Sequence, residues 1–230
     1  MLSFPRRRRG KDKHQLYSIP DITSFILVYQ RDSHIALFFA QALQNRVGSG
    51  IIYRGDEMGE YTHIVHGFEP VFDKHSRVLI LGSLPSVKSR EAGFYYGHPR
   101  NRFWTVLAAL TGQPKPESTE EKRKFLLGAG IAVWDVIAEC DIIGSSDASI
   151  KNVIPADLSL ITAVCPNIAV FANGGTAARL YGKYQAEKTG LPITALPSTS
   201  PANAAWGLDR LTAEWGRLMG GALSGGREQL

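Results

Sequence analysis

The chain has 230 residues, a formal net charge of +5 at pH 7 and two cysteines, Cys140 and Cys165. This length suits one domain with a substantial core, or one domain with an appendage. Two distant cysteines argue against a disulfide framework and against a four-thiolate iron–sulfur cluster, and no apolar run in the sequence is long enough to span a membrane. We therefore expect a monomeric cytoplasmic protein without a metal or other cofactor.

The positive charge is concentrated near the N-terminus. Residues 1–57 hold nine Lys and Arg against five Asp and Glu, whereas residues 58–230 hold seventeen against sixteen. The basic run Arg6–Arg9 is typical of a nucleic-acid arm or a targeting signal, although such tails are more often simply disordered. Residues 22–44 could form a strand and a helix. We expect residues 1–57 to be an N-terminal extension, either disordered or a mis-assigned start, and residues 58–230 to be the functional domain.

Short apolar runs alternate with helical segments after residue 58. A run of this kind without polar alternation suits a strand buried on both faces of a parallel sheet. The four runs are Val78–Leu81, Ile131–Trp134, Ile168–Ala172 and Ile193–Leu196. The pattern predicts an α/β fold, a three-layer sandwich around a four-stranded, mostly parallel sheet.

The segments between the strands have their own signals. Pro99 suits the first position of a helix that runs to about Leu110. Residues 208–223 have the pattern of a final amphipathic helix, and residues 141–152 are polar and predict a loop.

Polar side chains follow each predicted strand: Ser83, Asp135, Asn173 and Ser198. Ligands of open α/β sheets bind at the carboxyl edge of the strands, so we expect these residues to converge there. Asn173 begins the sequence Asn-Gly-Gly-Thr, which could hold an anion at a helix N-terminus or could serve only as a turn. No spacing of His, Asp and Glu suggests a metal site, and no nucleophilic triad is evident.

The loop after the first strand combines three adjacent aromatic residues with basic ones. Phe94, Tyr95 and Tyr96 lie among Lys88, Arg90, Arg100 and Arg102. Aromatic faces among cations are suited to stacking on a base while holding its phosphates. The alternative is that the aromatic residues belong to the core and the cations to a solvated rim.

Three sequence blocks stand out: GSLPS at 82–86, YYGHPRNRFW at 95–104 and LPSTSPANA at 196–204. Together they resemble the uracil-DNA glycosylase superfamily, and in particular its hypoxanthine (deoxyinosine) DNA glycosylase family. The resemblance implies the uracil-DNA glycosylase fold and a monofunctional glycosylase of base excision repair. Its substrate would be DNA that contains a deaminated base, hypoxanthine first and uracil as a second candidate.

The resemblance also implies roles for the base-binding residues. Ser83 and Asn173 would contact the extruded nucleotide, and Tyr95 or Tyr96, with Phe94 as the alternative, would stack on the base. Asp135 falls where relatives keep an Asn that reads the base edge, although it could equally cap a helix. A carboxylate there accepts hydrogen bonds from a ring N–H but does not donate unless protonated.

Leu84 stands where many relatives have the Asp or Asn that orients the attacking water. The resemblance therefore moves the catalytic role to Asn101, whose alternative role is to cap its own helix. Because no lysine is placed as an amine nucleophile, we expect no strand-cutting lyase activity.

The expected DNA contacts are Lys88, Arg90, Arg100, Ser198, Thr199, Ser200 and Asn203. Three other interpretations remain open at this point. They are a mismatch-type uracil-DNA glycosylase, a catalytically weak lesion-binding protein, and an unrelated α/β enzyme that binds a phosphorylated metabolite at Asn173-Gly174-Gly175.

Overall fold

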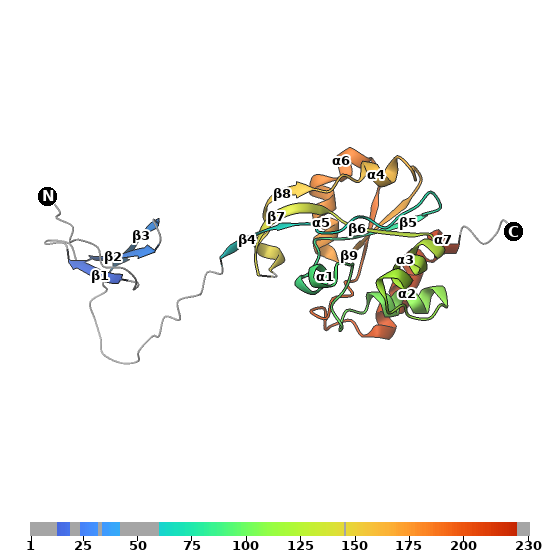
Figure 1. Cartoon of the computed structure of the whole chain (residues 1–230), viewed down its shortest axis with the longest axis horizontal. Coiled ribbons are helices and arrows are strands. Elements are labelled where there is room, and N and C mark those ends of the chain that lie inside the picture. The colour runs from blue at the N-terminus through green and yellow to red at the C-terminus, as the bar shows by residue number, and fades with distance from the viewer. Residues whose placement is uncertain (1–12, 19–23, 32–33, 42–59, 145, 225–230) are drawn as a thin grey trace. The chain divides into compact units, whose positions relative to one another are not determined.

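A computed structural model describes residues 13–18, 24–31, 34–41, 60–144 and 146–224. The chain divides into two compact units, Met1–Asp56 and Glu57–Leu230. In the first unit, β1 (Lys13–Ser18), β2 (Ser24–Arg31) and β3 (His34–Gln41) form an antiparallel sheet (Figure 1). The segment for which we expected a strand and a helix therefore contains two paired strands. The basic run Arg6–Arg9 lies outside the described residues.

The second unit is built on a parallel sheet with the strand order β10-β9-β5-β6. These strands are β5 (Val78–Gly82), β6 (Ile131–Asp135), β9 (Ala169–Asn173) and β10 (Ile193–Leu196). Every residue of β5 and β6 is buried, which explains why both strands are continuously apolar. The sequence prediction of a four-stranded parallel sheet is confirmed.

The register of this sheet brings the carboxyl ends of its strands together. Gly82 pairs with Asp135, and Leu196 pairs with Asn173. The loops that leave these four strands must therefore begin at one edge of the sheet. This edge is where a ligand is expected to bind in an open α/β sheet.

Helices cover both faces of the sheet, as Figure 1 shows. On one side lie α2 (Phe103–Thr111), α3 (Thr119–Gly128) and α7 (Leu208–Ser224). On the other lie α4 (Ser159–Thr162), α5 (Gly175–Tyr184) and α6 (Ala186–Thr189). The final helix is confirmed, and its Leu211, Trp215 and Met219 are buried at helical spacing. The three-layer α/β architecture is confirmed.

A second, antiparallel sheet was not predicted. It has the order β4-β7-β8, from β4 (Tyr61–Val65), β7 (Ile137–Ile143) and β8 (Lys151–Pro155). The predicted loop over residues 141–152 is therefore wrong at both ends, and only the segment around the 3₁₀ turn Asp147–Ser149 connects the strands. The physical reason is that β7 fully buries only some of its residues, so its partly buried polar side chains resemble those of a loop.

The long loop after β5 differs from its prediction in two places. It contains a short helix, α1 (Val87–Ala92), which Ser86 caps by accepting a hydrogen bond from the Ser89 N–H. Helix α2 begins at Phe103 and not at Pro99. Pro99 instead takes the second position of a turn in which the Asn101 N–H donates to the His98 carbonyl at 2.8 Å. The fixed φ angle of proline serves this turn as well as it would serve a helix start.

Candidate active site

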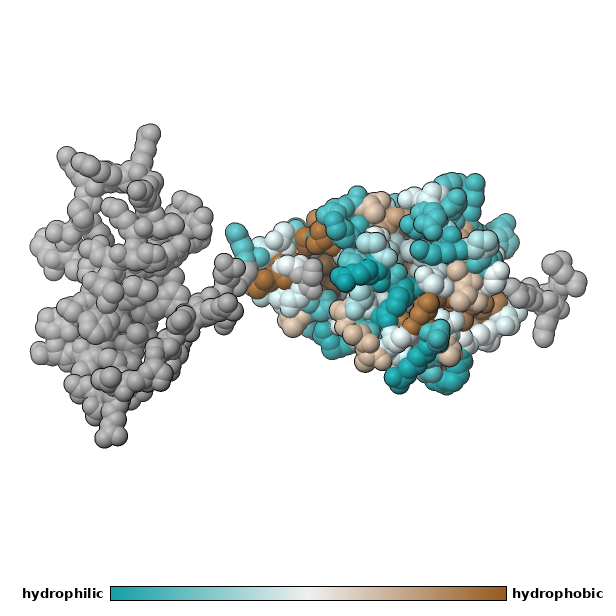
Figure 2. Space-filling view, turned by 90° about the horizontal axis from the view of Figure 1, so that it is seen from below, coloured by the Kyte–Doolittle hydropathy of each residue, from teal (hydrophilic) through white to brown (hydrophobic). Residues whose placement is uncertain are grey.

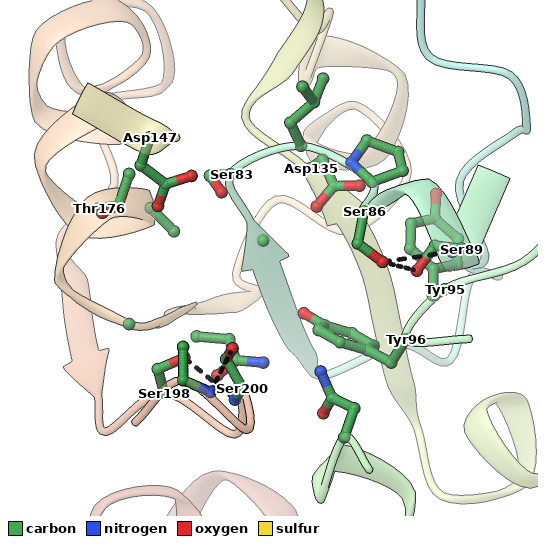
Figure 3. A pocket seen from close by; sticks show the side chains of 18 of the residues that line it. Ser83, Ser86, Ser89, Tyr95, Tyr96, Asp135, Asp147, Thr176, Ser198 and Ser200 are labelled. Carbon is green, nitrogen blue, oxygen red and sulfur yellow. Dashed lines mark hydrogen bonds between the residues drawn. The ribbon is translucent and has the colours of Figure 1, made fainter. Parts of the chain in front are cut away.

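A cavity of about 410 Å³ lies at the carboxyl edge of the parallel sheet (Figure 3). This volume falls within the range of ligand pockets and can hold a single base. Nine of the predicted site residues line it: Ser83, Arg90, Tyr95, Tyr96, Asn101, Asp135, Asn173, Ser198 and Ser200. Lys88, Arg100, Thr199 and Asn203 are outside its lining. The topology therefore brings together the four strand ends that the sequence singled out.

Two glycines permit close approaches in the cavity wall. A Cβ atom on Gly82 would clash with Asp135 Oδ1 and would lie 3.4 Å from the Tyr96 hydroxyl oxygen. Gly174 has a φ of +104°, and a Cβ there would lie 3.0 Å from the Cβ of Ser198. Glycine at these positions lets the chain at the end of β5 approach Asp135 and Tyr96, and the chain after β9 approach Ser198.

Asp135 is paired with a histidine that the sequence did not single out. His66 Nε2 lies 2.9 Å from Asp135 Oδ2, and only 5% and 6% of the two side chains are exposed. Because a carboxylate only accepts hydrogen bonds, His66 donates through Nε2. Nδ1 of the same ring is buried without a partner among the described residues. Asp135 ends β6 and does not cap a helix.

The three adjacent aromatic residues have different surroundings. Tyr95 is 2% exposed, donates to the Glu69 carbonyl at 3.1 Å and packs edge-on against Phe68. Phe94 is 4% exposed and stacks against Trp104. Both side chains therefore have the environment of core residues, although Tyr95 also touches the cavity.

Tyr96 is the member of the three that reaches into the cavity with a free polar group. It is partly buried, its backbone φ is +53°, and its ring stacks on Phe103 with the centroids 3.7 Å apart. Its hydroxyl is buried and has no hydrogen-bond partner among the described residues. Burial, and then the nearby Asp135 carboxylate, raise the pKa of this hydroxyl, while the Asn173 amide acts weakly in the opposite direction. The group is therefore a hydrogen-bond donor at physiological pH.

Asn101 lies just before α2 and lines the cavity. Its Oδ1 accepts a hydrogen bond from the Phe103 N–H at 3.0 Å, so Asn101 caps the first N–H of the helix from the position before the N-cap residue, Arg102. Its amide NH₂ makes no hydrogen bond within the described residues. The cap fixes the side chain at the cavity wall and leaves its donor group available to a ligand.

The loop from Pro197 to Trp206 forms the wall opposite Tyr96 and Asp135. Asn173 binds Thr199 twice, since its amide donates to Thr199 Oγ1 and accepts from the Thr199 N–H, both at 2.9 Å. Thr199 is fully buried. The Asn173 amide therefore anchors this loop to the end of β9.

Arg102 holds the same loop from the other side. Its guanidinium donates to backbone carbonyls of the loop, those of Thr199 (3.2 Å), Ser200 (2.6 Å), Asn203 (3.1 Å) and Trp206. An arginine that is committed to four carbonyls acts as a structural clamp.

The remaining predicted DNA contacts are on or near the surface. Lys88 pairs with Glu91 at 2.6 Å, and Arg90 donates to the Pro85 carbonyl at 2.8 Å. Arg100 is exposed. In the opposite wall, Ser198 Oγ accepts from the Ser200 N–H at 3.2 Å and the Asn203 amide donates to the Ser198 carbonyl at 2.9 Å.

The surface of the second unit has a mixed character. On the face in Figure 2, hydrophilic residues predominate and smaller hydrophobic patches are scattered among them. Within the described residues, no three His, Cys, Asp or Glu side chains are grouped so as to hold a metal ion. In the same part of the chain, no helix has the length and apolar character needed to cross a membrane.

His66 is the main site residue that sequence reasoning missed. It stands directly after β4, 69 positions before Asp135, and no motif links the two. The antiparallel pairing of β4 with β7, the strand that follows β6, brings them together. A prediction of the second sheet would have been needed to find this pair.

Comparisons with known proteins agree with the resemblance. Residues 69–217 match the family model described as uracil DNA glycosylase superfamily. A hypoxanthine DNA glycosylase of Methanosarcina acetivorans is 33% identical over 155 residues, which cover 66% of this chain and 96% of that protein. One of Methanosarcina barkeri is 32% identical over 140 residues, 60% of this chain and 87% of that protein. The solution NMR structure of a candidate uracil DNA glycosylase from M. acetivorans superposes with a TM-score of 0.59 at 31% identity, covering 68% of this chain and 97% of the other.

Proposed function

Because the chain belongs to the uracil-DNA glycosylase superfamily, we propose that it is a monofunctional DNA glycosylase that removes deaminated bases in base excision repair. Hypoxanthine is the principal substrate in this proposal and uracil a second one. The names of the relatives from Methanosarcina support the choice of hypoxanthine. The enzyme would act as a monomer and without a cofactor.

The observation that carries the proposal is the cavity at the carboxyl edge of the sheet. Its volume suits one base and not a duplex, so the target nucleotide must leave the stack to enter it. A deaminated base pairs poorly with its partner, which lowers the cost of extrusion. The cavity then offers Tyr96, Asn101 and Asp135 to the extruded nucleotide.

We assign the catalytic role to Asn101. Breaking an N-glycosidic bond builds positive charge on the sugar and negative charge on the leaving base. The Asn101 Oδ1 is engaged with the Phe103 N–H, so its NH₂ is the group that can donate to the departing base. The nearby N-terminus of α2 favours the same negative charge.

Leu84 also lines the cavity and cannot orient a water molecule. Catalysis in this proposal therefore depends on positioning and on stabilisation of the leaving base, and not on a strong general base. No lysine lines the cavity in the part of the chain that the structure describes. This supports attack by water and argues against an amine nucleophile with lyase activity.

The DNA backbone would be held at the cavity mouth. Ser198 and Ser200 line the cavity from the opposite wall, and the backbone of this loop, which Arg102 and Asn173 fix in place, could press into the duplex. Lys88, Arg90 and Arg100 would contact phosphates from the loop after β5. Such contacts position the duplex without reading its sequence.

The proposal is tested with duplexes that contain one hypoxanthine, uracil or xanthine, next to matched undamaged duplexes. We expect release of hypoxanthine, and strand cleavage only after alkali treatment, because a monofunctional enzyme leaves an intact abasic strand. Asn101→Ala is the matched inactive control. Release of none of the three bases would contradict the proposal, and cleavage without alkali would contradict its monofunctional part.

Leu84 favours one second candidate, a lesion-binding protein that detects or protects damaged DNA without cleaving it. The residue leaves the usual water-orienting position of the superfamily without a polar group. Tight binding to a lesion whose glycosidic bond is still intact after long incubation would support this candidate over the first.

A further inference from the structure

Asp147 is an acidic residue of the cavity that the steps assigned to Asn101 do not use. It is exposed, and it lines the cavity together with Ser83 and Thr176. Figure 3 shows its carboxylate pointing toward Ser83, on the side of the cavity that lies across from Tyr96. Within the described residues, this carboxylate makes no hydrogen bond and no ion pair.

The turn that carries Asp147 is closed by hydrogen bonds. Asp147 begins the 3₁₀ turn Asp147–Ser149 between β7 and β8. The Ser149 hydroxyl accepts from the Ile143 N–H at 2.8 Å and donates to the Ser146 carbonyl at 2.7 Å. The Ser149 N–H donates to the same carbonyl at 2.9 Å. These contacts hold Asp147 at one place in the cavity wall.

A carboxylate at this place opposes DNA binding, because it repels the phosphates of the strand that delivers the nucleotide. Among the described residues, the acidic members of the lining are Asp135 and Asp147. Asp135 is hydrogen-bonded to His66, whereas Asp147 has no such partner in the same part of the chain. The charge of Asp147 is therefore better explained by chemistry in the cavity than by binding.

Hydrolysis requires a water molecule on the side of the sugar that faces away from the leaving base. Inverting glycosidases activate this water with a carboxylate. The base belongs on the side of Tyr96 and Asn101, since the Tyr96 ring stacks on Phe103 and the Phe103 N–H donates to Asn101. Asp147 lies across the cavity from that side (Figure 3). Leu84, at the usual water-orienting position, has no polar group to offer.

We propose that Asp147 holds the attacking water and accepts its proton, as a second catalytic residue beside Asn101. The bond between C1′ of the sugar and the ring nitrogen of the base breaks, and its electron pair leaves with the base. A lone pair of the water oxygen forms the new bond to C1′, and one water proton passes to the Asp147 carboxylate. The base then takes a proton from solvent and Asp147 returns its own, so the reaction consumes one water molecule.

This role does not require a strong base. The sugar is already positively charged when the water attacks it, so the water becomes acidic as the new bond forms. The negative charge of Asp147 also stabilises the cationic sugar. The inference rests on the proposed function, because it takes hydrolysis of the glycosidic bond as the reaction.

The first test is Asp147→Asn, which keeps the shape of the side chain and removes its charge. We expect single-turnover release of hypoxanthine at saturating DNA to slow by about tenfold or more. Lesion affinity should stay the same or rise, because a charge that repels phosphates is gone, and the melting temperature should be unchanged. The matched control is Glu187→Gln, which neutralises an exposed carboxylate on α6 outside the cavity lining and should leave the cleavage rate unchanged.

A structural role for Asp147 predicts a different pattern. Helix α5 has no side-chain cap and no acidic residue in its first turn, so a nearby carboxylate would stabilise its N-terminus. In that case Asp147→Asn should lower the melting temperature and leave the rate at saturating DNA unchanged. That result would overturn the inference, as would a rate that falls only together with lesion affinity and melting temperature.

The second test concerns Ser149 as a positioning residue that acts through Asp147. Ser149→Ala opens the hydrogen-bonded turn, so it should slow cleavage in the wild-type background. It should have no further effect on cleavage in the Asp147→Asn background, because the group that it positions is already lost. Equal fold losses in the two backgrounds would overturn the positioning role of Ser149.

The wild-type reaction separates failure of this inference from failure of the proposed function. If the wild type releases no deaminated base, the proposed function fails and the inference fails with it. If the wild type releases hypoxanthine and Asp147→Asn releases it as fast, the proposed function stands and the inference is wrong.

Discussion

The two walls of the cavity differ in how completely their polar groups are paired. We call Tyr96 and Asp135 the reading wall and residues 197–206 the loop wall. Among the residues that the structure describes, the reading wall leaves a buried hydroxyl and one carboxylate oxygen without a protein partner. Most polar groups of the loop wall have hydrogen-bond partners. Arg102 donates to four of its backbone carbonyls, and the Asn173 amide binds both the N–H and the hydroxyl of Thr199.

The difference indicates which wall adapts to a ligand and which wall is already complete. A saturated hydrogen-bond network fixes one conformation and gains little from a ligand. An unpaired buried polar atom costs free energy in the empty site and recovers it when a ligand pairs with it. The reading wall therefore has the character of a recognition surface, and the loop wall that of a prebuilt support for the DNA backbone.

The largest effect is expected from Tyr95, the neighbour of Tyr96 in the chain. Tyr95 is buried, its hydroxyl is paired with the Glu69 carbonyl, and it packs on Phe68 and Phe94. Tyr95→Ala should lower the free energy of unfolding by about 3–5 kcal/mol, because it removes a buried aromatic side chain. The measurement is a denaturant titration, with Tyr96→Ala beside it.

Tyr96→Ala should cost less stability than Tyr95→Ala and more lesion affinity, of the order of 1–3 kcal/mol. These two outcomes would show that Tyr95 stabilises the fold and that Tyr96 contacts the lesion. If Tyr95→Ala melts like the wild type and loses lesion binding, Tyr95 is the residue that contacts the base.

The next effect concerns Asn101, whose Oδ1 accepts a hydrogen bond and whose NH₂ has no partner within the described part of the chain. Asn101→Ala should slow single-turnover cleavage of hypoxanthine DNA at least about 100-fold, or about 2.7 kcal/mol of barrier. It should also cost about 1 kcal/mol of stability, because the Phe103 N–H loses its cap.

Asn101→Ser separates the two contributions. A serine hydroxyl can accept from the Phe103 N–H, so we expect the melting temperature to recover, while cleavage stays as slow as in Asn101→Ala because no amide donor is restored. Recovery of cleavage together with stability would show that Asn101 only caps its helix. Asp135 or Ser83 would then be the next catalytic candidates.

A smaller effect is expected from Arg102, which tests whether the loop wall is a prebuilt support. Arg102→Met keeps much of the aliphatic length and removes all four carbonyl contacts, and we expect it to lower the free energy of unfolding by about 2–3 kcal/mol. DNA affinity should fall on damaged and undamaged duplexes alike, because the support is not specific for the base.

Arg100→Met is the matched control for Arg102→Met. Arg100 is an exposed arginine two positions away, so its loss should leave the melting temperature unchanged and should weaken DNA binding in a salt-dependent way. If the two variants melt alike, the Arg102 clamp contributes nothing to the loop wall.

The sequence allowed the parallel sheet to be predicted because its strands are buried on both faces. Val78–Gly82 and Ile131–Asp135 carry no alternation that could be confused with another element. The antiparallel sheet could not be predicted in the same way. Its strand Ile137–Ile143 includes Glu139 and Asp141, which are only partly buried and resemble loop residues. One-sided burial weakened the signal of this sheet.

The site was predictable where a motif or a strand end marked it, and not where tertiary contact alone did. Ser83, Asp135, Asn173 and Ser198 could be placed at one edge because parallel strands end together. His66 could not, because its contact with Asp135 depends on the second sheet. The sequence also could not show which of Phe94, Tyr95 and Tyr96 belong to the core. Three adjacent aromatic residues do not reveal which hydroxyl lacks a partner among the described residues.

The smallest effect is expected from residues 1–57, which contribute to neither wall as we define them. The second compact unit begins at Glu57, and the residues that form both walls belong to it. A chain that starts at Met58 should keep the melting temperature of the second unit and the single-turnover rate at saturating DNA. We expect a change only in affinity for undamaged DNA at low salt. There the loss of Arg6–Arg9 should make the slope of log affinity against log salt shallower by about 0.9 for each side chain that had neutralised a phosphate.

The full-length chain with Arg6–Arg9 replaced by glutamine is the matched control for this truncation. It should reproduce the shallower salt dependence while keeping the rest of residues 1–57, including β1, β2 and β3. If the truncated chain instead loses stability or cleavage at saturating DNA, and the glutamine variant does not, then the first unit supports the second through contacts other than charge.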